Sequence, residues 1–364
     1  MDLAILSVSF LAFLLLGVPV SFALGLSCVL TYLHEGLPAA TAMQSMISGM
    51  NAFSFLAVPF FILSGELMLH GGIADRILRF AQSLVGHFRG GLGMANVVAC
   101  TLFGGVSGSP TADTSAMGGV VIPLMKREGY SAAYAVNVTT HASLAGALMP
   151  TSTNMIIYAF AAQGIVGTLN GQQVSGVSIG DLLFSGLLPV LWVMGFVLIA
   201  AYWQAKRYGF PRRADGSTEL PPFPGWLAVA RAFVGAVPGL MVIALILVCV
   251  AGGIATATEA AAIAVAYSLG LTVLVYRSMT WHKFRRALAH AAKTTGVVLL
   301  LIAVSNMLRF QMAYLEIPDA IEQMLTQTSA APWLMLLYIN ILQVFLGTFV
   351  DMAAHILITT PLFL

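Results

Sequence analysis

The sequence predicts an all-α polytopic membrane protein built from inverted structural repeats with two re-entrant helical hairpins. Of the 364 residues, 59% are hydrophobic and only 8% are charged. Apolar runs follow one another at close to the roughly 20 residues that cross a bilayer. Two polar turns, each with one aspartate, interrupt these runs near residues 92–125 and 333–364. Backbone at membrane depth leaves the helix only where protein or water surrounds it, and a carboxylate there points to a functional site.

The order of apolar segments predicts the spans. The first run, residues 3–33, has no basic leader and no small-residue cleavage site, so we expect a retained helix rather than a signal peptide. We expect the spanning segments to cover residues 4–33, 53–69, 131–164, 181–205, 226–250, 255–276 and 294–312.

The basic residues orient these spans. Fifteen of the sixteen Lys and Arg fall on one side of the predicted membrane, and Arg309 near an outer helix end is the remaining one. The positive-inside rule makes the basic side cytoplasmic. The fifteen are Arg76, Arg79, Arg89, Lys126, Arg127, Lys206, Arg207, Arg212, Arg213, Arg231, Arg277, Lys283, Arg285, Arg286 and Lys293.

The same charges test the first hairpin. If residues 92–125 crossed the membrane once, Arg89 and Lys126 would face opposite sides. A re-entrant path keeps both inside, and arms of about 12 to 15 residues are short for two full spans. Two closely spaced spans or one kinked helix are the alternatives.

Between the spans, Ile73, Ile77 and Phe80 recur at helical spacing, which predicts an amphipathic helix on the cytoplasmic surface.

Two segments of similar pattern indicate an internal repeat. FGGVSGSPTADTSAMGGVVIPLM from residue 103 and FLGTFVDMAAHILITTPLFL from residue 345 share a phenylalanine, a glycine, an aspartate and a later proline in one order. The alignment pairs Gly105 with Gly347 and Asp113 with Asp351. The basic residues predict that the first hairpin opens toward the cytoplasm and the second toward the opposite side of the membrane. Inverted repeats that bind at the midplane are a recurrent transporter architecture.

The repeat predicts the domain organisation. Residues 1–206 form the first repeat, with the inward-opening hairpin at 92–125 and a broken helix at 131–164; residues 207–225, rich in proline, form a cytoplasmic linker. Residues 226–364 form the second repeat, with the outward-opening hairpin from 333. Symmetry requires a counterpart of the broken helix after that hairpin, so we expect the whole protein to continue for roughly 40 or more residues.

Polar breaks predict a cation site. Hydroxyls, carbonyls and a carboxylate suit a hard cation such as sodium, and a helix break frees carbonyls as ligands. The expected sodium ligands are Ser107, Gly108, Ser109, Asp113, Pro150, Thr151, Ser152, Gly347 and Asp351. The side chains expected to bind the solute are Ser109, Pro110, Thr111, Thr153 and Asn154.

Close helix packing is the alternative explanation for such small polar residues. Two aspartates at matching repeat positions favour a site, because burying each charge without compensation costs at least a few kcal/mol. Glu66 and Glu259 also lie in apolar runs, but neither adjoins a glycine-rich break. We expect helix-to-helix hydrogen bonding or a helix end to explain them.

Absent motifs exclude several functions. The chain has no GxxxxGK[ST], HExxH or GxSxG, so we expect neither nucleotide hydrolysis nor an enzyme, and energy must come from an ion gradient or a partner. The two aspartates do not read as the catalytic pair of an intramembrane protease. Three scattered cysteines predict no disulfide framework and no metal-ligand spacing, and dispersed basic residues predict no nucleic-acid partner. We expect no cofactor.

Several segments together resemble a known family. GVPVSFALG, PFFILSGELM, GGLGMANVVACTLFGGVSGSPTADTSAMG, IPLMKREGY, MPTSTNMIIY and GIATATEAAAIAV look like the large membrane subunit of tripartite ATP-independent periplasmic (TRAP) transporters, from about residue 10 to residue 364. The resemblance implies an elevator-type carrier, with a scaffold and a transport domain, that moves an organic acid with sodium as coupling ion across the bacterial inner membrane. It also implies two partners, a small four-helix membrane subunit and a periplasmic solute-binding protein.

The chain departs from the family pattern at two points. Pro110 follows GS where the family usually has a hydroxyl or small residue, and Met149–Pro150 stands where a proline pair is common. The resemblance does not identify the solute. The alternative is a sodium- or proton-coupled carboxylate carrier of the same superfamily that works without a binding protein, whereas a channel or a membrane scaffold would need neither the hairpins nor the inverted repeat.

Overall fold

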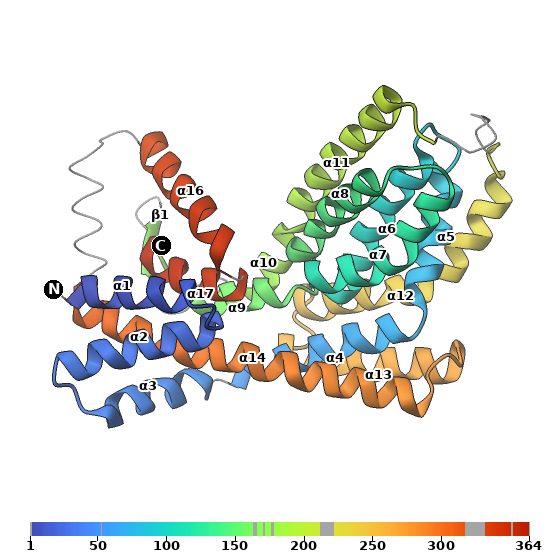
Figure 1. Ribbon diagram of the computed structural model, residues 1–364. Coiled ribbons are helices and arrows are strands. Elements are labelled where there is room, and N and C mark those ends of the chain that lie inside the picture. Colours follow the sequence, from blue (N-terminus) through green and yellow to red (C-terminus); the bar gives the residue numbers. More distant parts are fainter. Residues whose placement is uncertain are drawn as a thin grey trace. The chain divides into compact units, whose positions relative to one another are not determined.

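The computed structural model describes residues 2–51, 53–162, 166–169, 172–175, 178–211, 222–316, 332–350 and 352–363. Contacts divide the chain into two compact units (Figure 1). The first comprises Met1–Phe55, Ile157–Val177 and Lys293–Leu364, and the second Leu56–Ile156 and Ser178–Ala292. Each unit contains residues from both halves of the sequence, so the two units do not coincide with the two predicted repeats. The division into repeats stays a prediction.

The first unit contains three N-terminal helices, α1 (Asp2–Leu15), α2 (Val20–His34) and α3 (Ala39–Met50), and two later ones, α16 (Pro332–Phe349) and α17 (Met352–Phe363). It also contains strands β1 (Val166–Leu169) and β2 (Gln172–Ser175), which pair antiparallel with Val166 opposite Ser175. This short hairpin is an exception to the all-α prediction.

The single helix predicted over residues 4–33 is wrong. Two helices of 14 and 15 residues stand there, and they pack against each other. Gly17 adopts a left-handed φ of +79°, and Pro19 precedes the second helix. Because proline lacks the amide hydrogen that a continuing helix needs, the chain turns at this point despite its unbroken hydrophobicity.

The core of the first unit joins α2 to α14. Leu24 and Cys28 from α2 are buried against Val304 and Leu308 from α14 (Trp281–Tyr314). Both pairs are four residues apart, so each helix turns one face into the contact. Cys28 therefore acts as a small packing residue, as its apolar surroundings predict.

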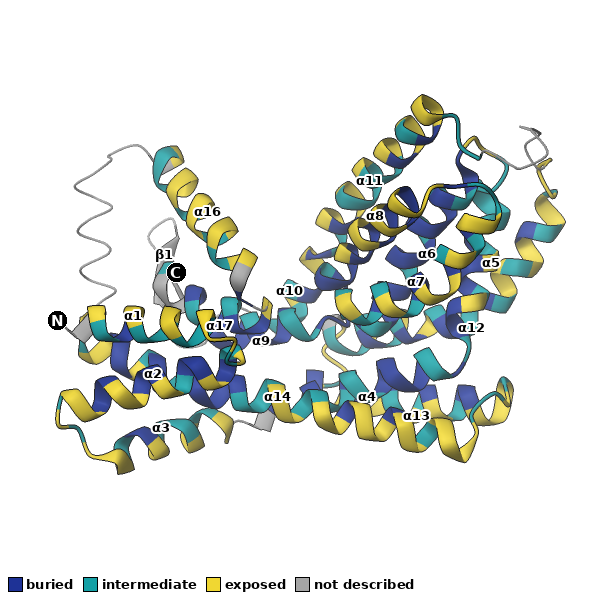
Figure 2. Ribbon diagram, in the orientation of Figure 1, coloured by how far each residue is buried: buried dark blue, intermediate teal, exposed yellow. Residues whose placement is uncertain are grey.

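The second unit is helical throughout its described residues. Its elements in chain order are α4 (Ala57–His70), α5 (Ile73–Val85), α6 (Gly91–Ser107), α7 (Pro110–Arg127), α8 (Ala132–Ser143), the 3-10 turn η2 (Leu144–Leu148), the start of α9 (Thr153–Ala161), α10 (Ile179–Ser185), α11 (Leu187–Tyr208), α12 (Trp226–Ala251), α13 (Ala257–Gly270), the π turn η3 (Leu271–Val275) and the first part of α14. Helix α6 lies among α5, α7, α8 and α11 (Figure 1). Figure 2 shows α6 largely buried and α11 with a broad exposed face.

Four described helical segments have the length and hydropathy to cross a membrane: Ile179–Tyr208, Trp226–Val250, Ala257–Val275 and Trp281–Tyr314. The pair α4 and α5, bent by 69°, is a fifth candidate. On α11, the large apolar side chains Trp192 and Phe196 are 62% and 64% exposed, as expected for a surface that faces lipid. The chain is a multi-pass membrane protein.

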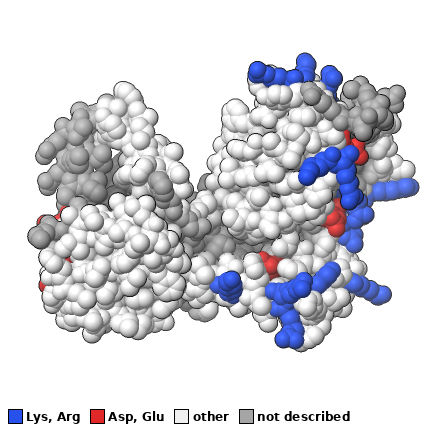
Figure 3. Space-filling view, in the orientation of Figure 1, with Lys and Arg blue, Asp and Glu red and all other residues white. Residues whose placement is uncertain are grey.

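One predicted span is part of a longer helix, and one predicted amphipathic helix is present. The span predicted over residues 294–312 belongs to the 34-residue helix α14, which begins at Trp281 and is about 51 Å long. Helix α5 is amphipathic as predicted: Ile73 and Ile77 are buried, whereas Asp75 and Arg79 are exposed. Figure 3 shows Lys and Arg side chains at the C-terminal end of α11, near the N-terminal end of α12 and at the turn between α13 and α14. This placement agrees with the prediction that the basic residues of this unit lie on one side.

Candidate functional site

Helices α6 and α7 meet in a tight turn. Helix α6 ends at Ser107, Gly108 adopts a left-handed φ of +65°, and the hydroxyl of Ser109 accepts a hydrogen bond from the amide of Ala112 at 3.4 Å. Pro110 occupies the first position of α7, where a missing amide hydrogen costs nothing. Glycine is required at 108 because a Cβ there would collide with the carbonyl oxygen of Thr151.

The two arms are longer than predicted. Helices α6 and α7 have 17 and 18 residues, in place of about 12 to 15, and 17 residues is the lower limit for a spanning helix. Arm length therefore does not exclude two crossings. The basic residues at both ends of the pair still favour a re-entrant path, which stays a prediction.

Asp113 is the central group of the site. It lies in the first turn of α7 with 0% exposure, and the hydroxyl of Ser107 donates a hydrogen bond to its Oδ1. Its Oδ2 is buried without a hydrogen-bond partner. Among the described residues, Asp113 forms no ion pair. A buried carboxylate with one open oxygen and no protein cation needs a compensating partner, and the α7 N-terminus supplies part of it.

The predicted helix break lies beside this turn. Helix α8 ends at Ser143, the 3-10 turn η2 follows, and extended backbone at Met149 leads through Pro150 to α9. The hydroxyl of Thr151 donates to the carbonyl oxygen of Gly105 at 2.9 Å. Within the broken helix predicted over residues 131–164, the regular α-helix ends at Ser143, seven residues before Pro150. Thr151 thereby ties the break to the C-terminal end of α6.

The remaining residues of the break are close to the same turn. Ser152 is fully buried, and its hydroxyl accepts a hydrogen bond from the amide of Asn154 at 3.2 Å. A Cβ on Gly108 would lie 3.0 Å from the Cα of Ser152. Thr153 and Asn154 are half-buried. The structure thus brings the turn of the predicted hairpin at 92–125 next to the break in the predicted broken helix at 131–164.

The predicted solute residues at the start of α7 are more accessible. Ser109 and Pro110 are half-buried and Thr111 is exposed. The hydroxyls of Ser109 and Thr111 lie 3.1 Å apart, so either one can donate to the other. Hydroxyl groups at a helix N-terminus are suited to bind an anionic group.

Two glycines allow the close approach of η2 to α6. A Cβ on Gly104 would lie 2.6 Å from the Cα of Gly146 and 2.9 Å from Oδ2 of Asp113. A Cβ on Gly146 would collide with the same Oδ2. Any larger residue at either position would displace the carboxylate. Gly104 lies in the segment predicted to form the first hairpin, whereas no role was predicted for Gly146. The only signal for Gly146 in the sequence is that it is a glycine shortly before Pro150.

A buried polar pair between α6 and α8 was also missed. The amide nitrogen of Asn96 donates to the hydroxyl of Thr139 at 2.7 Å, and the thiol of Cys100 donates to the amide oxygen of Asn96 at 3.3 Å. Asn96, Cys100 and Thr139 have 0% exposure. This network holds α8 against α6 below the turn.

The second predicted tip is only partly described. Gly347 lies in the last turn of α16, with open space around the position of a Cβ, rather than in the turn that follows. Asp351 lies outside the described residues. Gly347 belongs to the first unit, and the expected meeting of the two tips stays a prediction.

The site favours a hard cation over a transition metal. Among the described residues, no group of three His, Cys, Asp or Glu is placed to hold a metal ion. A cation at Asp113 would therefore rely on one carboxylate with hydroxyl and carbonyl oxygens, the ligand type of hard cations.

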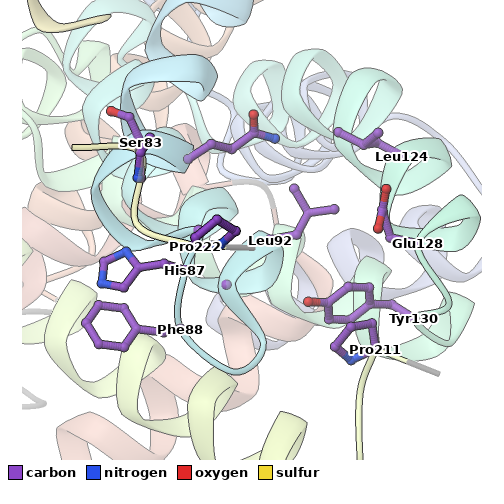
Figure 4. Close-up of a pocket in the computed structure, with 13 residues that line it drawn as sticks. Ser83, His87, Phe88, Leu92, Leu124, Glu128, Tyr130, Pro211 and Pro222 are labelled. Carbon is purple, nitrogen blue, oxygen red and sulfur yellow. The ribbon is translucent and has the colours of Figure 1, made fainter. Parts of the chain in front are cut away.

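A cavity of about 550 Å³ lies elsewhere in the second unit (Figure 4). Its wall combines apolar residues such as Phe88 and Leu92 with His87, Glu128 and Tyr130. It includes none of the predicted ion or solute residues. We place the candidate site at Asp113 because a buried carboxylate with an open oxygen has chemistry that this mainly apolar wall lacks.

The two other carboxylates in apolar runs are explained as predicted. Glu259 forms a capping box with Thr256 at the start of α13, where the Glu259 carboxylate accepts from the Thr256 amide at 2.8 Å. Glu66 of α4 forms a hydrogen bond with His290 of α14. Neither belongs to the site around Asp113.

Residues 7–364 match the family model described as tripartite ATP-independent periplasmic transporter, DctM component. The chain is similar to the C4-dicarboxylate TRAP transporter large permease protein DctM of Rhodobacter capsulatus, with 36% identity over 97% of this chain and 79% of that protein. The Vibrio cholerae protein of the same name is 32% identical over 100% of this chain and 80% of its own length. The 2,3-diketo-L-gulonate TRAP transporter large permease protein YiaN of Escherichia coli is 29% identical over 95% and 77%. These relatives are permeases and not enzymes.

Proposed function

Since this chain belongs to the family of the DctM component of tripartite ATP-independent periplasmic transporters, we propose that it acts as the large permease subunit that couples sodium entry to the uptake of an organic acid. The observation that carries the proposal is the fully buried Asp113 with its open Oδ2. A transported cation would supply the positive charge that the surrounding helices do not, and its release would leave a carboxylate that favours rebinding.

The ion ligands that we propose at this site come from the turn and from the helix break. Asp113 contributes Oδ2, and Ser107, Gly108, Ser109, Pro150, Thr151 and Ser152 surround it with hydroxyl and carbonyl oxygens. The hydrogen bond from Ser107 orients the carboxylate so that Oδ2 stays open. Support comes from the contact between Thr151 and Gly105, which holds the two segments together.

The solute that we propose is a small organic acid with a carboxylate group. Two relatives are named for C4-dicarboxylates and one for 2,3-diketo-L-gulonate, all of them acids. Ser109 and Thr111 offer hydroxyls on either side of Pro110 at the N-terminus of α7, and Thr153 and Asn154 offer polar groups beside them. Pro110 removes one amide donor from this end, so we expect the solute carboxylate to bind the hydroxyls instead.

The mechanism that we propose is an elevator, in which a transport domain carries the site past a scaffold domain. Its support is the repeated pattern around Asp113 and Asp351, because two hairpins of opposite orientation can enclose one solute from both sides. The partners belong to the same proposal: a small four-helix membrane subunit and a periplasmic solute-binding protein, with the assembly in the bacterial inner membrane.

Uptake in proteoliposomes tests this function. The chain is reconstituted with the small subunit, and uptake of a labelled C4-dicarboxylate is measured with and without a sodium gradient and with and without the binding protein from the same gene neighbourhood. We expect uptake only when the sodium gradient and the binding protein are both present. Uptake that needs sodium but not the binding protein would favour the carrier that works alone, and uptake that ignores sodium would remove the coupling ion from the proposal.

A further inference from the structure

A second buried carboxylate in the same unit meets two histidines. Glu66 lies in the apolar helix α4 with 6% exposure. Nδ1 of His290 lies 2.7 Å from Oε1 of Glu66, and Nδ1 of His70 lies 3.6 Å from Oε2. Nδ1 of His70 is also 3.0 Å from the carbonyl oxygen of Glu66. We call these three residues the Glu66 cluster.

The permanent charges near the Glu66 cluster are engaged or exposed elsewhere. Arg76 lies over the ring of Tyr276 at 3.8 Å, and the ammonium of Lys283 donates to the carbonyl oxygen of Ser278 at 3.1 Å. Helix α6 carries no Asp, Glu, Lys, Arg or His, and on α13 Glu259 is held by its cap and Tyr267 donates to a carbonyl of α12. The other charged or titratable groups on α5, on α14 as far as Lys293 and in the turn before α14 are exposed: Asp75, Arg79, Arg277, His282, Arg285, Arg286 and Lys293.

The ion-pair partners of Glu66 among the described residues are thus both histidines. An arginine or lysine at position 290 would hold the carboxylate at every physiological pH. Histidine is the side chain whose charge changes between about pH 5 and pH 8.

We infer that Glu66, His290 and His70 form a proton-binding site that joins α4 to α14. With the proton bound, a histidinium faces the carboxylate and the contact is an ion pair. Without it, a neutral imidazole keeps only a hydrogen bond to Glu66. The contact is therefore stronger at acidic pH and weaker at alkaline pH. The neighbouring basic residues are predicted to lie on the cytoplasmic side, so we expect the site to respond to the internal pH.

The neighbouring residue connects this site to Asp113. Gly65 precedes Glu66 in α4, and a Cβ on Gly65 would lie 3.1 Å from the carbonyl oxygen and 3.2 Å from the Cα of Ser107. Ser107 in turn donates to Asp113. A movement of α4 that follows proton release thus reaches the residue that orients the carboxylate. This link to transport rests on the proposed function, whereas proton binding itself does not.

Hydrogen exchange tests the proton site without any transport. The detergent-solubilised chain and its His290→Gln variant are compared at about pH 6 and about pH 8.5. Glutamine keeps a hydrogen bond to Glu66 but cannot carry charge. We expect peptides from residues 281–292 to exchange about two to five times faster in the variant at the acidic pH and equally fast at the alkaline pH. Comparison at one pH removes the intrinsic pH dependence of exchange.

The control is His282→Gln, which removes an exposed histidine two turns earlier on the same helix. It should exchange like the wild type at both pH values. Glu66→Gln is the second variant and should reproduce His290→Gln. A difference of equal size at both pH values would mean that His290 is only structural and would overturn the proposal, as would no difference at about pH 6.

Uptake against internal pH then tests the link to Asp113. We expect the sodium concentration for half-maximal uptake to shift with internal pH in the wild type and in His282→Gln but not in His290→Gln. A proton site seen by exchange together with a sodium response that ignores pH would overturn the link alone. Absence of sodium-driven uptake at every pH would count against the proposed function and leave the exchange result unaffected.

Discussion

The hydroxyl of Ser107, the last residue of α6, donates to one carboxylate oxygen of Asp113 in the first turn of α7. This hydrogen bond spans the Gly108 turn. The other oxygen of Asp113 is buried and has no hydrogen-bond partner. One serine therefore both closes the turn and orients the carboxylate.

Asp113→Asn should weaken sodium activation of uptake by about ten- to a hundredfold, because a charged ligand is replaced by a neutral one of the same shape. Ser107→Ala should weaken it less, since the carboxylate stays charged but loses its orientation. Sodium dependence of uptake in proteoliposomes measures both effects. The matched control is Asp75→Asn, which neutralises an exposed aspartate and should leave the sodium dependence unchanged. Normal activation in Asp113→Asn would remove Asp113 from the site.

Gly146→Ala should destabilise the second unit by about 1 to 3 kcal/mol, because the added methyl group collides with the Asp113 carboxylate. Gly119→Ala is the control: position 119 is helical, and a Cβ there meets nothing within 4 Å. Alanine at 119 should be neutral or slightly stabilising, since it favours the helix. Thermal unfolding in detergent compares the two variants, and equal unfolding temperatures would contradict the close approach of η2 to α6.

Thr139→Val should cost about 1 to 3 kcal/mol, because it leaves the buried amide of Asn96 without its acceptor. Thr140→Val is the neighbouring control, since Thr140 is exposed and its hydroxyl bonds only to its own helix at Val136. The free energy of unfolding should change little in this control. Combination with Asn96→Leu should recover part of the loss, and purely additive effects would show that the two side chains do not interact.

Cysteines placed at positions 89 and 126 in a background without the native cysteines should react from the same side of sealed vesicles. The reason is that both positions are basic and flank the α6–α7 pair, so a re-entrant path keeps them on the cytoplasmic side. An impermeant thiol reagent applied to right-side-out and inverted vesicles measures the accessibility. A cysteine at 207, in the last turn of α11, serves as the cytoplasmic reference. Reaction of 89 and 126 from opposite sides would mean that the pair crosses the membrane an odd number of times.

Proline and glycine residues show which breaks in the helices can be predicted from the local sequence. Gly108 turns the chain because glycine tolerates a left-handed φ, and Pro150 lies in the non-helical segment between η2 and α9 because proline lacks the amide hydrogen that a helix needs. Both segments were predictable from single residues, although the regular α-helix already ends at Ser143. The same chemistry acts at Gly17 and Pro19, where the long apolar run led to the prediction of one helix. Hydrophobic length indicates that a segment enters the membrane but not whether it stays in one helix.

The sequence by itself determined which segments are apolar enough for a membrane, the family, and the polar residue types around Asp113, because composition and spacing are properties of neighbouring positions. Only the tertiary structure decided which distant residues meet. The bond between Glu66 and His290 joins positions 224 residues apart, and the contacts of Gly146 with Gly104 and Asp113 depend on how η2 packs against α6. Such contacts arise from the packing of whole helices, and no local pattern specifies which face of one helix meets which face of another.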